Sequence, residues 1–325
     1  MQCVLIIQTA FLGDVILATP LIESFKETYP QIEIDFLVKK GNESLLENNP
    51  NLRQVYTFDK STKWSSILSL SRTFRRNNYD LTVNLQRFTS SGIITFLSGA
   101  KLTVGFQQNP FSFLFSKKIK HEIGNGTHEV DRNLKLIAEW IKTPIRQPKL
   151  YPSTSDFEAI QSYQTESYCC LAPSSVWFTK EAPLSYWQDL AKELTVRNFK
   201  VILLGAPNEI ERSKAIETVI PKESVINLTG KLSLLQSAAL MKNARMNFVN
   251  DSGPMHLCSS MNAPTTVFFC STVPAFGFGP LSDDAKIIEV KDLGCRPCGL
   301  HGFKSCPKEH FNCGKRLPKV DLIHL

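Results

Sequence analysis

The sequence lacks a long apolar run. Nowhere in its 325 residues is there an uninterrupted stretch of the roughly 18–20 apolar residues that a membrane-spanning helix needs. The N-terminus has no basic segment followed by an apolar one and a small-residue cleavage site, so no secretory signal is predicted. We therefore expect a cytoplasmic protein whose nine cysteines stay reduced. At 42% hydrophobic and 21% charged residues, the composition is globular, and the length allows two domains.

Two ligand-binding signatures are also missing. No G-x-G-x-x-G follows an apolar segment, which argues against a dehydrogenase that binds a dinucleotide. No D-x-D-like pair of carboxylates stands out, so the sequence predicts no metal clamp for a nucleoside diphosphate. A Mg²⁺ ion carried with a diphosphate stays open.

Negative charge is scarce in one stretch of the chain, residues 60–120. Asp80 is the only acidic residue there, against ten basic ones: Lys60, Lys63, Arg72, Arg75, Arg76, Arg87, Lys101, Lys117, Lys118 and Lys120. Such an excess is typical of a solvated surface, or of a surface that meets an anion. The anion could be a phosphorylated substrate or an acidic membrane face. Nucleic acid is the least favoured partner, because no nucleic-acid-binding motif accompanies the charges.

What the sequence does contain is an alternation of short apolar strands and helices. In the second half we expect strands over Tyr168–Ala172, Lys200–Leu204, Val225–Leu228, Met246–Val249 and Thr265–Phe269, with helices over Leu184–Arg197, Glu209–Val219, Leu232–Asn243 and Pro254–Met261. The first half predicts strands over Val4–Ile7, Ile32–Val38, Val55–Phe58, Leu81–Asn84 and Thr103–Gly105, with helices over Val15–Thr28, Ser44–Asn48, Ser65–Arg75 and Gly92–Leu97. This alternation indicates parallel sheets covered on both faces.

The two halves meet at a proline-containing stretch. Three prolines between residues 143 and 160 interrupt the pattern, so we place an N-terminal domain at 1–152, a linker at 153–165 and a C-terminal domain at 166–325. The predicted fold class is α/β, with two Rossmann-like domains. Ligands of such domains bind at the carboxyl ends of the strands, and we expect the two parallel sheets to face one another across a cleft.

The stretch Asn250–His256 (NDSGPMH) follows one of these strands and opens a helix. Its small residues, its backbone N–H groups and the positive end of the helix dipole suit a phosphate or a diphosphate. Beside Asp251, Ser252 could cap the helix and Gly253 permits close approach of a ligand. His256 lies one turn inside the helix. An ordinary capped helix with a structural histidine would give the same pattern.

A second turn is expected to lie beside this one. Ser174, Ser175 and Lys180 follow the first strand of the C-terminal domain, and two hydroxyls with a lysine can bind a diphosphate directly. If the two strands are neighbours, Lys180 should face the loop that holds Asp251. In the loop after the next strand, Glu209 could accept hydrogen bonds from a ribose diol, or could simply favour the start of a helix.

Near the N-terminus, the stretch QTAFLGDVILATP (residues 8–20) places Asp14 in a polar gap between an apolar strand and an apolar helix. Asp14 could cap that helix, or it could be a carboxylate at the mouth of a cleft. Because a helix N-terminus lowers the pKa of a nearby carboxyl group, we expect Asp14 to be ionised at pH 7 and to be a weak base.

Taken together and in this order, these stretches resemble the bacterial lipopolysaccharide heptosyltransferases, glycosyltransferase family 9. The resemblance covers nearly the whole chain and includes LGDVILATPLI, the PSS…K turn, the LLG-x-x-x-E loop, LTGKLSLLQSAALM and, above all, NDSGPMH. The cysteine-bearing tail resembles that of the heptosyltransferase II-like members. The resemblance implies a GT-B fold and the inverting transfer of heptose from ADP-L-glycero-D-manno-heptose to the inner core of lipopolysaccharide.

The resemblance also implies roles for individual residues. Asp14 would be the general base that takes the proton of the acceptor hydroxyl. The donor would be bound by Ser174, Ser175, Lys180, Glu209, Asp251, Ser252, Gly253 and His256. From the basic stretch we expect Lys63, Arg87 and Lys101 to touch anions of the acceptor and an anionic membrane surface at the cytoplasmic face of the inner membrane. No cofactor would be required, and the protein is expected to be a monomer.

The cysteines of the tail have more than one interpretation. A tetrahedral zinc site could be drawn from Cys295, Cys298, Cys306 and Cys313 with His301 and His310 nearby. The spacing suits no common zinc finger. Reduced structural thiols are therefore favoured over zinc, and disulfides come last.

Other functions stay open. A transferase that uses another nucleotide sugar, a sugar-nucleotide epimerase of the GT-B fold and a non-catalytic nucleotide-binding relative would share the fold. The sequence does not single out the few side chains that read the hydroxyls of the sugar, so it leaves the sugar undecided.

Overall fold

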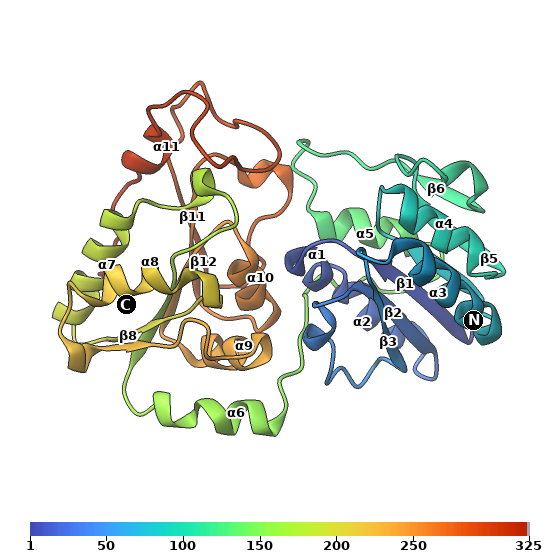
Figure 1. The fold of residues 1–325 in the computed structure, drawn as a ribbon, viewed down its shortest axis with the longest axis horizontal. Helices are drawn as coiled ribbons and strands as arrows, with labels where there is room; N and C mark the ends of the chain where they lie inside the picture. Colours follow the sequence, from blue (N-terminus) through green and yellow to red (C-terminus); the bar gives the residue numbers. More distant parts are fainter. Residues whose placement is uncertain (324–325) are drawn as a thin grey trace. The chain divides into compact units, whose positions relative to one another are not determined.

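The protein has two compact units, Met1–Tyr151 and the chain from Pro152 onward, in a computed structural model that describes residues 1–323 (Figure 1). Each unit contains one six-stranded sheet in which every pair of neighbouring strands is parallel. The predicted α/β class with two parallel sheets is confirmed.

The sheet of the N-terminal unit has the strand order β3-β2-β1-β4-β5-β6. Its strands are β1 (Cys3–Gln8), β2 (Glu33–Lys39), β3 (Gln54–Phe58), β4 (Leu81–Asn84), β5 (Leu102–Phe106) and β6 (Lys117–Ile119). The helices are α1 (Leu12–Ile16), α2 (Thr19–Thr28), α3 (Lys63–Asn77), α4 (Thr89–Leu97) and α5 (Glu129–Ile137), with short 3₁₀ turns η1 (Glu43–Leu45) and η2 (Ser112–Leu114). The central strand β1 is buried along its whole length, as its unbroken apolar run predicts.

The sheet of the C-terminal unit repeats this order as β12-β11-β10-β7-β8-β9. Its strands are β7 (Tyr168–Ala172), β8 (Lys200–Leu203), β9 (Val225–Asn227), β10 (Met246–Asn250), β11 (Thr265–Phe269) and β12 (Ala285–Glu289). The helices are α6 (Thr154–Ile160), α7 (Leu184–Val196), α8 (Ile210–Glu217), α9 (Leu234–Asn243), α10 (Gly253–Ser260) and α11 (Asn312–Lys315), with 3₁₀ turns η3 (Gln161–Tyr163), η4 (Phe178–Lys180), η5 (Pro207–Glu209), η6 (Lys222–Ser224) and η7 (Pro274–Phe276).

One predicted helix, Val15–Thr28, is two helices in the structure. Pro20 has no N–H to donate to the carbonyl of Ile16, and the Thr19 hydroxyl donates to that carbonyl instead, at 2.8 Å. The first helix ends before this point, and a second helix, α2, begins with Pro20 in its first turn. The short α1 that results keeps Asp14 close to the end of β1.

The segment expected to be a linker, 153–165, is also folded. Ser153 and Asp156 form a reciprocal cap at the start of α6, because the Ser153 hydroxyl accepts from the Asp156 N–H at 3.1 Å and the Asp156 carboxylate accepts from the Ser153 N–H at 2.8 Å. The Lys242 ammonium of α9 lies 5.6 Å from the centre of the Phe157 ring. The predicted linker is therefore a helix of the C-terminal unit.

The elements missing from the prediction are short or polar. Strands β6 (KKI) and β12 (AKIIE) are edge strands that stay partly exposed, so they carry little apolar signal. Helix α5 contains four charged residues in nine, and the structure shows that three of them, Glu129, Asp131 and Arg132, form ion pairs. The predicted helix Ser44–Asn48 is only the 3₁₀ turn η1.

Candidate functional site

The predicted site residues lie mainly where the strand order of each sheet reverses. In the N-terminal unit this point is between β1 and β4; Asp14 lies in α1, which follows β1, and Arg87 lies in the loop that follows β4. In the C-terminal unit it is between β7 and β10, and the loops that follow them hold Lys180 and Asp251. Open parallel sheets bind ligands at such points, outside the carboxyl ends of the strands.

Asp14 is a half-buried carboxylate with few hydrogen-bond partners. It is the third residue of α1, and its Oδ2 accepts a hydrogen bond of 3.2 Å from the N–H of Phe11, the residue that precedes the helix. Asp14 therefore does cap its helix. Burial, followed by the negative charge of Glu129, raises the pKa of Asp14 to about 6, against the opposing effects of the Phe11 N–H and the Arg87 charge.

This pKa corrects the expectation that the helix N-terminus would lower it. The dipole of a helix of five residues is small, and backbone hydrogen bonds such as that from the Phe11 N–H offset only part of the effect of burial, so the loss of water dominates. At pH 7 the group is still mostly ionised. It is a stronger base than an ordinary aspartate.

Behind Asp14 lies a buried cluster that the sequence did not single out. The Glu129 carboxylate is 3.1 Å from Nε2 of His121 and accepts from Nε of Arg132 at 2.6 Å. Burial alone would raise the pKa of Glu129, but the hydrogen bond and the charge of His121, together with Arg132, hold it below its ordinary value. Glu129 is thus kept negative, and this charge in turn raises the pKa of Asp14.

The three basic residues expected at the acceptor do not share one place. Arg87 is exposed, in the loop after β4. Lys63 opens α3, after β3, with its ammonium 5.5 Å from the centre of the Trp64 ring. Lys101 precedes β5 and binds Asp80, which precedes β4, at 2.7 Å. Because strand starts lie at the opposite edge of a parallel sheet from strand ends, the structure does not bring Lys101 to Asp14.

In the C-terminal unit Lys180 faces Asp251, as the sequence predicted for neighbouring strands. The Lys180 ammonium lies 2.7 Å from Oδ2 of Asp251, and both side chains are largely buried. The hydroxyl of Thr272, which follows β11, donates to the same oxygen at 2.6 Å. Asp251 thus holds the lysine in place at the carboxyl ends of β7 and β10.

The turn that carries Ser174 and Ser175 is fixed at both ends by Asn250, the last residue of β10. Its amide nitrogen donates to the Pro173 carbonyl at 2.8 Å, and its amide oxygen accepts from the Ala182 N–H at 2.9 Å. Within the turn, the buried Ser174 hydroxyl has no hydrogen-bond partner among residues 1–323. A buried hydroxyl without a partner inside a rigid turn suits a bound ligand oxygen.

Two further charged groups support this turn. Arg212 donates to the Pro173 carbonyl at 3.0 Å and lies 3.1 Å from the carboxylate of Glu181, which itself accepts from the Ser175 N–H at 2.8 Å. Burial raises the pKa of Glu209, which accepts from the Ala206 N–H at 2.8 Å. Arg212 was not predicted from the sequence, because an arginine inside a helix is ordinarily solvated.

The start of α10 lacks a side-chain cap. Ser252 occupies the capping position, but its hydroxyl lies 3.5 Å from the Asn250 carbonyl oxygen and bonds no N–H of the helix. The expectation that Ser252 caps the helix is therefore wrong. Gly253 and Pro254 form the first turn, and His256 is buried within the helix. A helix N-terminus without a capping side chain favours an anion.

The tail of the chain forms part of this site. The Phe303 N–H donates to the Thr179 hydroxyl at 2.8 Å, and the Thr179 N–H donates to the Phe303 carbonyl at 3.1 Å. At Gly302 an added Cβ atom would lie 2.4 Å from Cβ of Trp177, so only glycine permits this approach. Arg296 donates to the Thr272 carbonyl at 2.6 Å. The tail thus packs against the turn that ends in Lys180.

The cysteines of the tail are free thiols, like the other five. Sγ of Cys295 lies 3.9 Å from Nε2 of His310, and burial raises the pKa of Cys313 to about 11, which keeps this thiol protonated. In the described part of the chain, residues 1–323, no group of three or more His, Cys, Asp or Glu side chains is arranged to hold a metal ion. The preference for reduced thiols over zinc stays a prediction.

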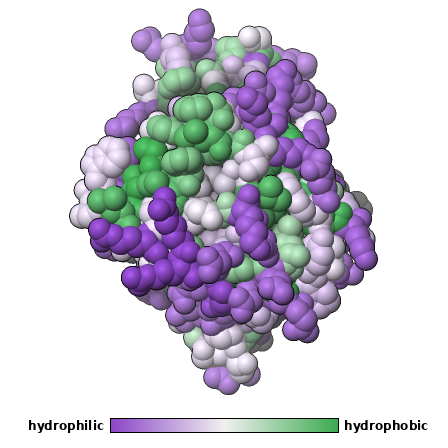
Figure 2. Space-filling model, turned by 90° about the vertical axis from the view of Figure 1, so that its right-hand side faces the viewer, coloured by the Kyte–Doolittle hydropathy of each residue, from purple (hydrophilic) through white to green (hydrophobic). Residues whose placement is uncertain are grey.

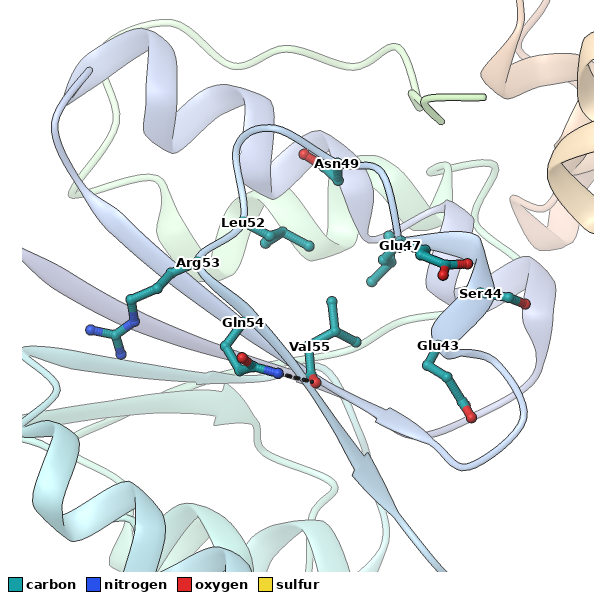
Figure 3. A pocket seen from close by; sticks show the side chains of 9 residues that line it. Glu43, Ser44, Glu47, Asn49, Leu52, Arg53, Gln54 and Val55 are labelled. Atoms are coloured by element: carbon teal, nitrogen blue, oxygen red, sulfur yellow. Dashed lines mark hydrogen bonds between the residues drawn. The ribbon is translucent and has the colours of Figure 1, made fainter. Parts of the chain in front are cut away.

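A surface cavity of about 370 Å³ lies elsewhere in the N-terminal unit, between η1 and the edge strand β3 (Figure 3). Glu43 and Glu47 line it, beside Arg53, and none of the predicted site residues does. Glu43 accepts from the Gly41 N–H at 2.5 Å. Carboxylates at its rim disfavour a diphosphate, so this cavity is not a candidate for the donor site.

Comparison with known proteins gives a consistent result. Residues 67–305 match the family model of glycosyltransferase family 9 (heptosyltransferase). The chain is 26% identical to the lipopolysaccharide core heptosyltransferase OpsX of Haemophilus influenzae over 80% of this chain and 76% of that protein. It is 24% identical to lipopolysaccharide heptosyltransferase 1 of Pseudomonas aeruginosa, over 91% and 85% of the two chains.

Solved structures agree on the fold. The ADP-heptose lipopolysaccharide heptosyltransferase II of Escherichia coli superposes with a TM-score of 0.77 at 19% identity, covering 97% of this chain and 98% of that one. A family 9 glycosyltransferase of Veillonella parvula gives a TM-score of 0.82 at 21% identity, covering 90% and 86%. These likenesses, at such low identity, show the GT-B fold, which the sequence predicted.

Proposed function

The chain belongs to glycosyltransferase family 9, the heptosyltransferases, and on that premise we propose that it transfers heptose from ADP-L-glycero-D-manno-heptose to the inner core of lipopolysaccharide. One observation carries the proposal. The point between β7 and β10 gathers a lysine, two serine residues and a helix N-terminus without a capping side chain, which are the groups that a nucleoside diphosphate requires. The curated relatives, which match most of the chain, are named as lipopolysaccharide heptosyltransferases.

In the proposed reaction Asp14 is the general base. As the acceptor oxygen attacks the anomeric carbon of the donor, Asp14 takes the hydroxyl proton, and the bond to the diphosphate breaks on the opposite face of the sugar. The configuration at that carbon then inverts, and ADP leaves. Support comes from the raised pKa of Asp14, about 6, which combines an ionised group at pH 7 with useful basicity.

Departure of ADP needs stabilisation of the negative charge that develops on the diphosphate. We propose that Lys180, Ser174, Ser175, His256 and the first turn of α10 at Ser252–Gly253 supply it. Asp251 would orient Lys180, and Glu209 would meet the ribose. On this proposal the protein needs no bound metal, while Mg²⁺ carried with the diphosphate stays open. Addition of a chelator tests this point, because the proposed reaction should continue at an unchanged rate.

The acceptor is a glycolipid, so its location bears on that of the enzyme. No helix within residues 1–323 is long and apolar enough to cross a membrane. We propose that the enzyme acts as a monomer at the cytoplasmic face of the inner membrane, and that Lys63 and Arg87 contact the anions of the acceptor. Lys101 has less support, because its ammonium binds Asp80 at the other edge of the sheet.

The test is a coupled assay of ADP release with a heptose-deficient core glycolipid as acceptor. The proposal predicts release of ADP from ADP-heptose only when the acceptor is present. A thermal-shift panel of ADP-, UDP- and GDP-sugars measures donor preference in parallel. Clear preference for a UDP-sugar would overturn the heptose assignment, and epimerisation of the donor without acceptor would favour an epimerase.

A further inference from the structure

The N-terminal unit exposes large apolar side chains on the part of its surface that the sequence had described only by its charge. Trp64 (65% exposed), Leu68 (55%), Phe96 (51%), Phe113 (69%) and Leu114 (37%) come from α3, α4 and η2. We call these five residues the apolar patch. Single exposed apolar residues are normal, but a contiguous set marks an interaction surface.

The three elements that carry the five residues adjoin one another. Trp64 and Leu68 are one turn apart on the same face of α3, and that face continues to Arg72 and Arg75. Nε of Arg75 donates to the Leu97 carbonyl at 3.2 Å, so α3 lies beside α4.

On its other side α4 lies against the turn that contains η2. A Cβ atom at Gly92 of α4 would be 2.8 Å from Cβ of Phe111, and the Phe111 ring stacks on Phe113 at 6.1 Å between centroids. Figure 2, which faces the side of the N-terminal unit with α3, α4, β5 and β6, shows an apolar area there, bordered by hydrophilic residues.

The border of the patch is basic. Arg72, Arg76 and Lys118 are exposed, and none of them has an ion-pair partner among the residues that the structure describes. Basic groups around exposed aromatic and aliphatic side chains match an anionic lipid interface, where the ammonium and guanidinium groups meet headgroup phosphates and the rings enter the boundary with the acyl chains. A second copy of the same face would instead set like charges against each other.

We propose that the apolar patch enters the headgroup region of an anionic bilayer, with Arg72, Arg76 and Lys118 on the headgroup phosphates. This deepens the membrane location proposed above and rests on it. The placement of Trp64 is favourable for a glycolipid acceptor, because the first turn of α3 follows β3 and so lies toward the sheet edge that carries Asp14.

The apolar contribution separates this proposal from attraction by charge alone. Salt screens the basic groups, and at about 1 M salt the Debye length is about 3 Å. Burial of rings and aliphatic groups is not screened in this way. Binding to vesicles should therefore have a salt-sensitive part that depends on the basic groups and a salt-resistant part that depends on the patch.

The experiment measures cosedimentation of the full chain with vesicles of phosphatidylethanolamine containing a quarter of phosphatidylglycerol. Replacement of Phe96 and Phe113 by serine should lower the salt-resistant part of the binding by about a hundredfold, since each buried ring is worth about one factor of ten. Reversal of Arg72, Arg76 and Lys118 to glutamate should remove the salt-sensitive part. The matched control is Val196→Ser on α7 of the other unit, which removes an apolar side chain that is 81% exposed and should leave binding unchanged.

Fluorescence gives a second and independent measurement. The difference in emission between the wild type and Trp64→Phe isolates Trp64, whose emission should shift to the blue and be quenched by lipids with a nitroxide at the headgroup. Unchanged emission of Trp64, or equal vesicle binding by the wild type and the Phe96→Ser/Phe113→Ser variant, would overturn the proposal. So would self-association of the wild type that this variant abolishes, in the absence of vesicle binding.

Transferase activity distinguishes the two proposals. With a short, soluble core oligosaccharide as acceptor, the Phe96→Ser/Phe113→Ser variant should release ADP at the wild-type rate. Vesicle binding without release of ADP would overturn the proposed transferase function but not the proposed membrane binding by the apolar patch. Release of ADP without vesicle binding would overturn the membrane binding but not the transferase function.

Discussion

The same sheet topology carries two aspartates with opposite surroundings. Asp251, after β10, is held by the Lys180 ammonium and the Thr272 hydroxyl within 2.7 Å. Asp14, after β1, accepts from the Phe11 N–H at 3.2 Å and lies near the negative charge of Glu129. One carboxylate is held in place by direct contacts with a cation and a hydroxyl. The other is deprived of water and of a cation in contact, and its affinity for a proton rises.

The contrast indicates a division of labour. A site that must hold a small, highly charged diphosphate gains from rigid and satisfied polar groups. A general base must be able to take up a proton, so its ionised form cannot be strongly stabilised. The network of Asn250, Arg212 and Thr272 on one side, and the scarcity of partners on the other, fit these two requirements.

The largest effect is expected from Asp14→Asn, which removes the base but keeps an oxygen for the Phe11 N–H. The rate of transfer should fall about 10²–10⁴-fold, while the affinity for ADP stays the same, because the donor contacts belong to other residues. Steady-state kinetics and calorimetry with ADP measure the two effects. Asp131→Asn, which removes a partly exposed carboxylate paired with Arg146, is the control. Full activity of Asp14→Asn would remove Asp14 from the mechanism.

The next effect concerns the fixed carboxylate. Lys180→Met leaves Asp251 largely buried without its cation, which should cost about 2–4 kcal/mol of unfolding free energy and weaken ADP binding about 10–100-fold. Lys214→Met is the control, because Lys214 pairs with Glu211 on the exposed surface of α8 and should change either value by less than about 0.5 kcal/mol. Chemical unfolding and ADP titration measure both. Equal losses of stability and of ADP affinity in Lys180→Met and Lys214→Met would show that Lys180 has no special role in holding Asp251 or the donor.

The third prediction is a dependence on pH that arises from Asp14. Because its pKa is raised to about 6, the rate should rise with pH through about 6 and then level off. The folded state binds the proton more tightly than the unfolded state, so this contribution to stability is complete below the ordinary pKa near 4 and is lost as the pH rises through about 6. At pH 8 the free energy of unfolding of Asp14→Asn should therefore exceed that of the wild type by about 1–2 kcal/mol, allowing for partial exposure. If Asp14→Asn were less stable than the wild type at pH 8, burial of the ionised Asp14 would not be destabilising.

A smaller effect is expected from Thr272→Val, which removes one hydrogen bond to Asp251 and keeps the shape of the side chain. ADP affinity should fall about fivefold, the equivalent of about 1 kcal/mol. Thr195→Val, on the exposed end of α7, is a control with no expected effect. An unchanged affinity in Thr272→Val would mean that Lys180 alone positions Asp251.

The smallest effect separates the basic residues at the two edges of the N-terminal sheet. Arg87→Gln should raise the KM for the acceptor several-fold, because Arg87 follows β4 and its charge reaches Asp14. Lys101→Gln should change it by less than about twofold, because Lys101 pairs with Asp80 at the other edge. Acceptor titrations at fixed donor concentration measure the difference, and a larger effect of Lys101→Gln would restore its predicted place in the site.

The sequence by itself determined the fold class and the positions of the two candidate sites. Buried parallel strands must be largely apolar, so β1, β7 and β10 could be predicted from the sequence. The polar residues that follow each strand marked its carboxyl end. That rule placed Asp14, Lys180 and Asp251 without a structure. Pairing of Lys180 with Asp251 followed from one further assumption, that β7 and β10 are neighbours.

Only the tertiary structure decided the burial, the hydrogen-bond partners and the nearby charges of each group. The pKa of Asp14 depends on burial and on Glu129, which is 115 residues away in the chain and lies on α5, a short helix with four charged residues in nine. Ser252 does not cap α10, because the local backbone turns its hydroxyl toward Asn250. The apolar patch also needed coordinates: a sequence shows that Trp64, Phe96 and Phe113 are apolar, but their exposure on one surface depends on how α3, α4 and η2 pack.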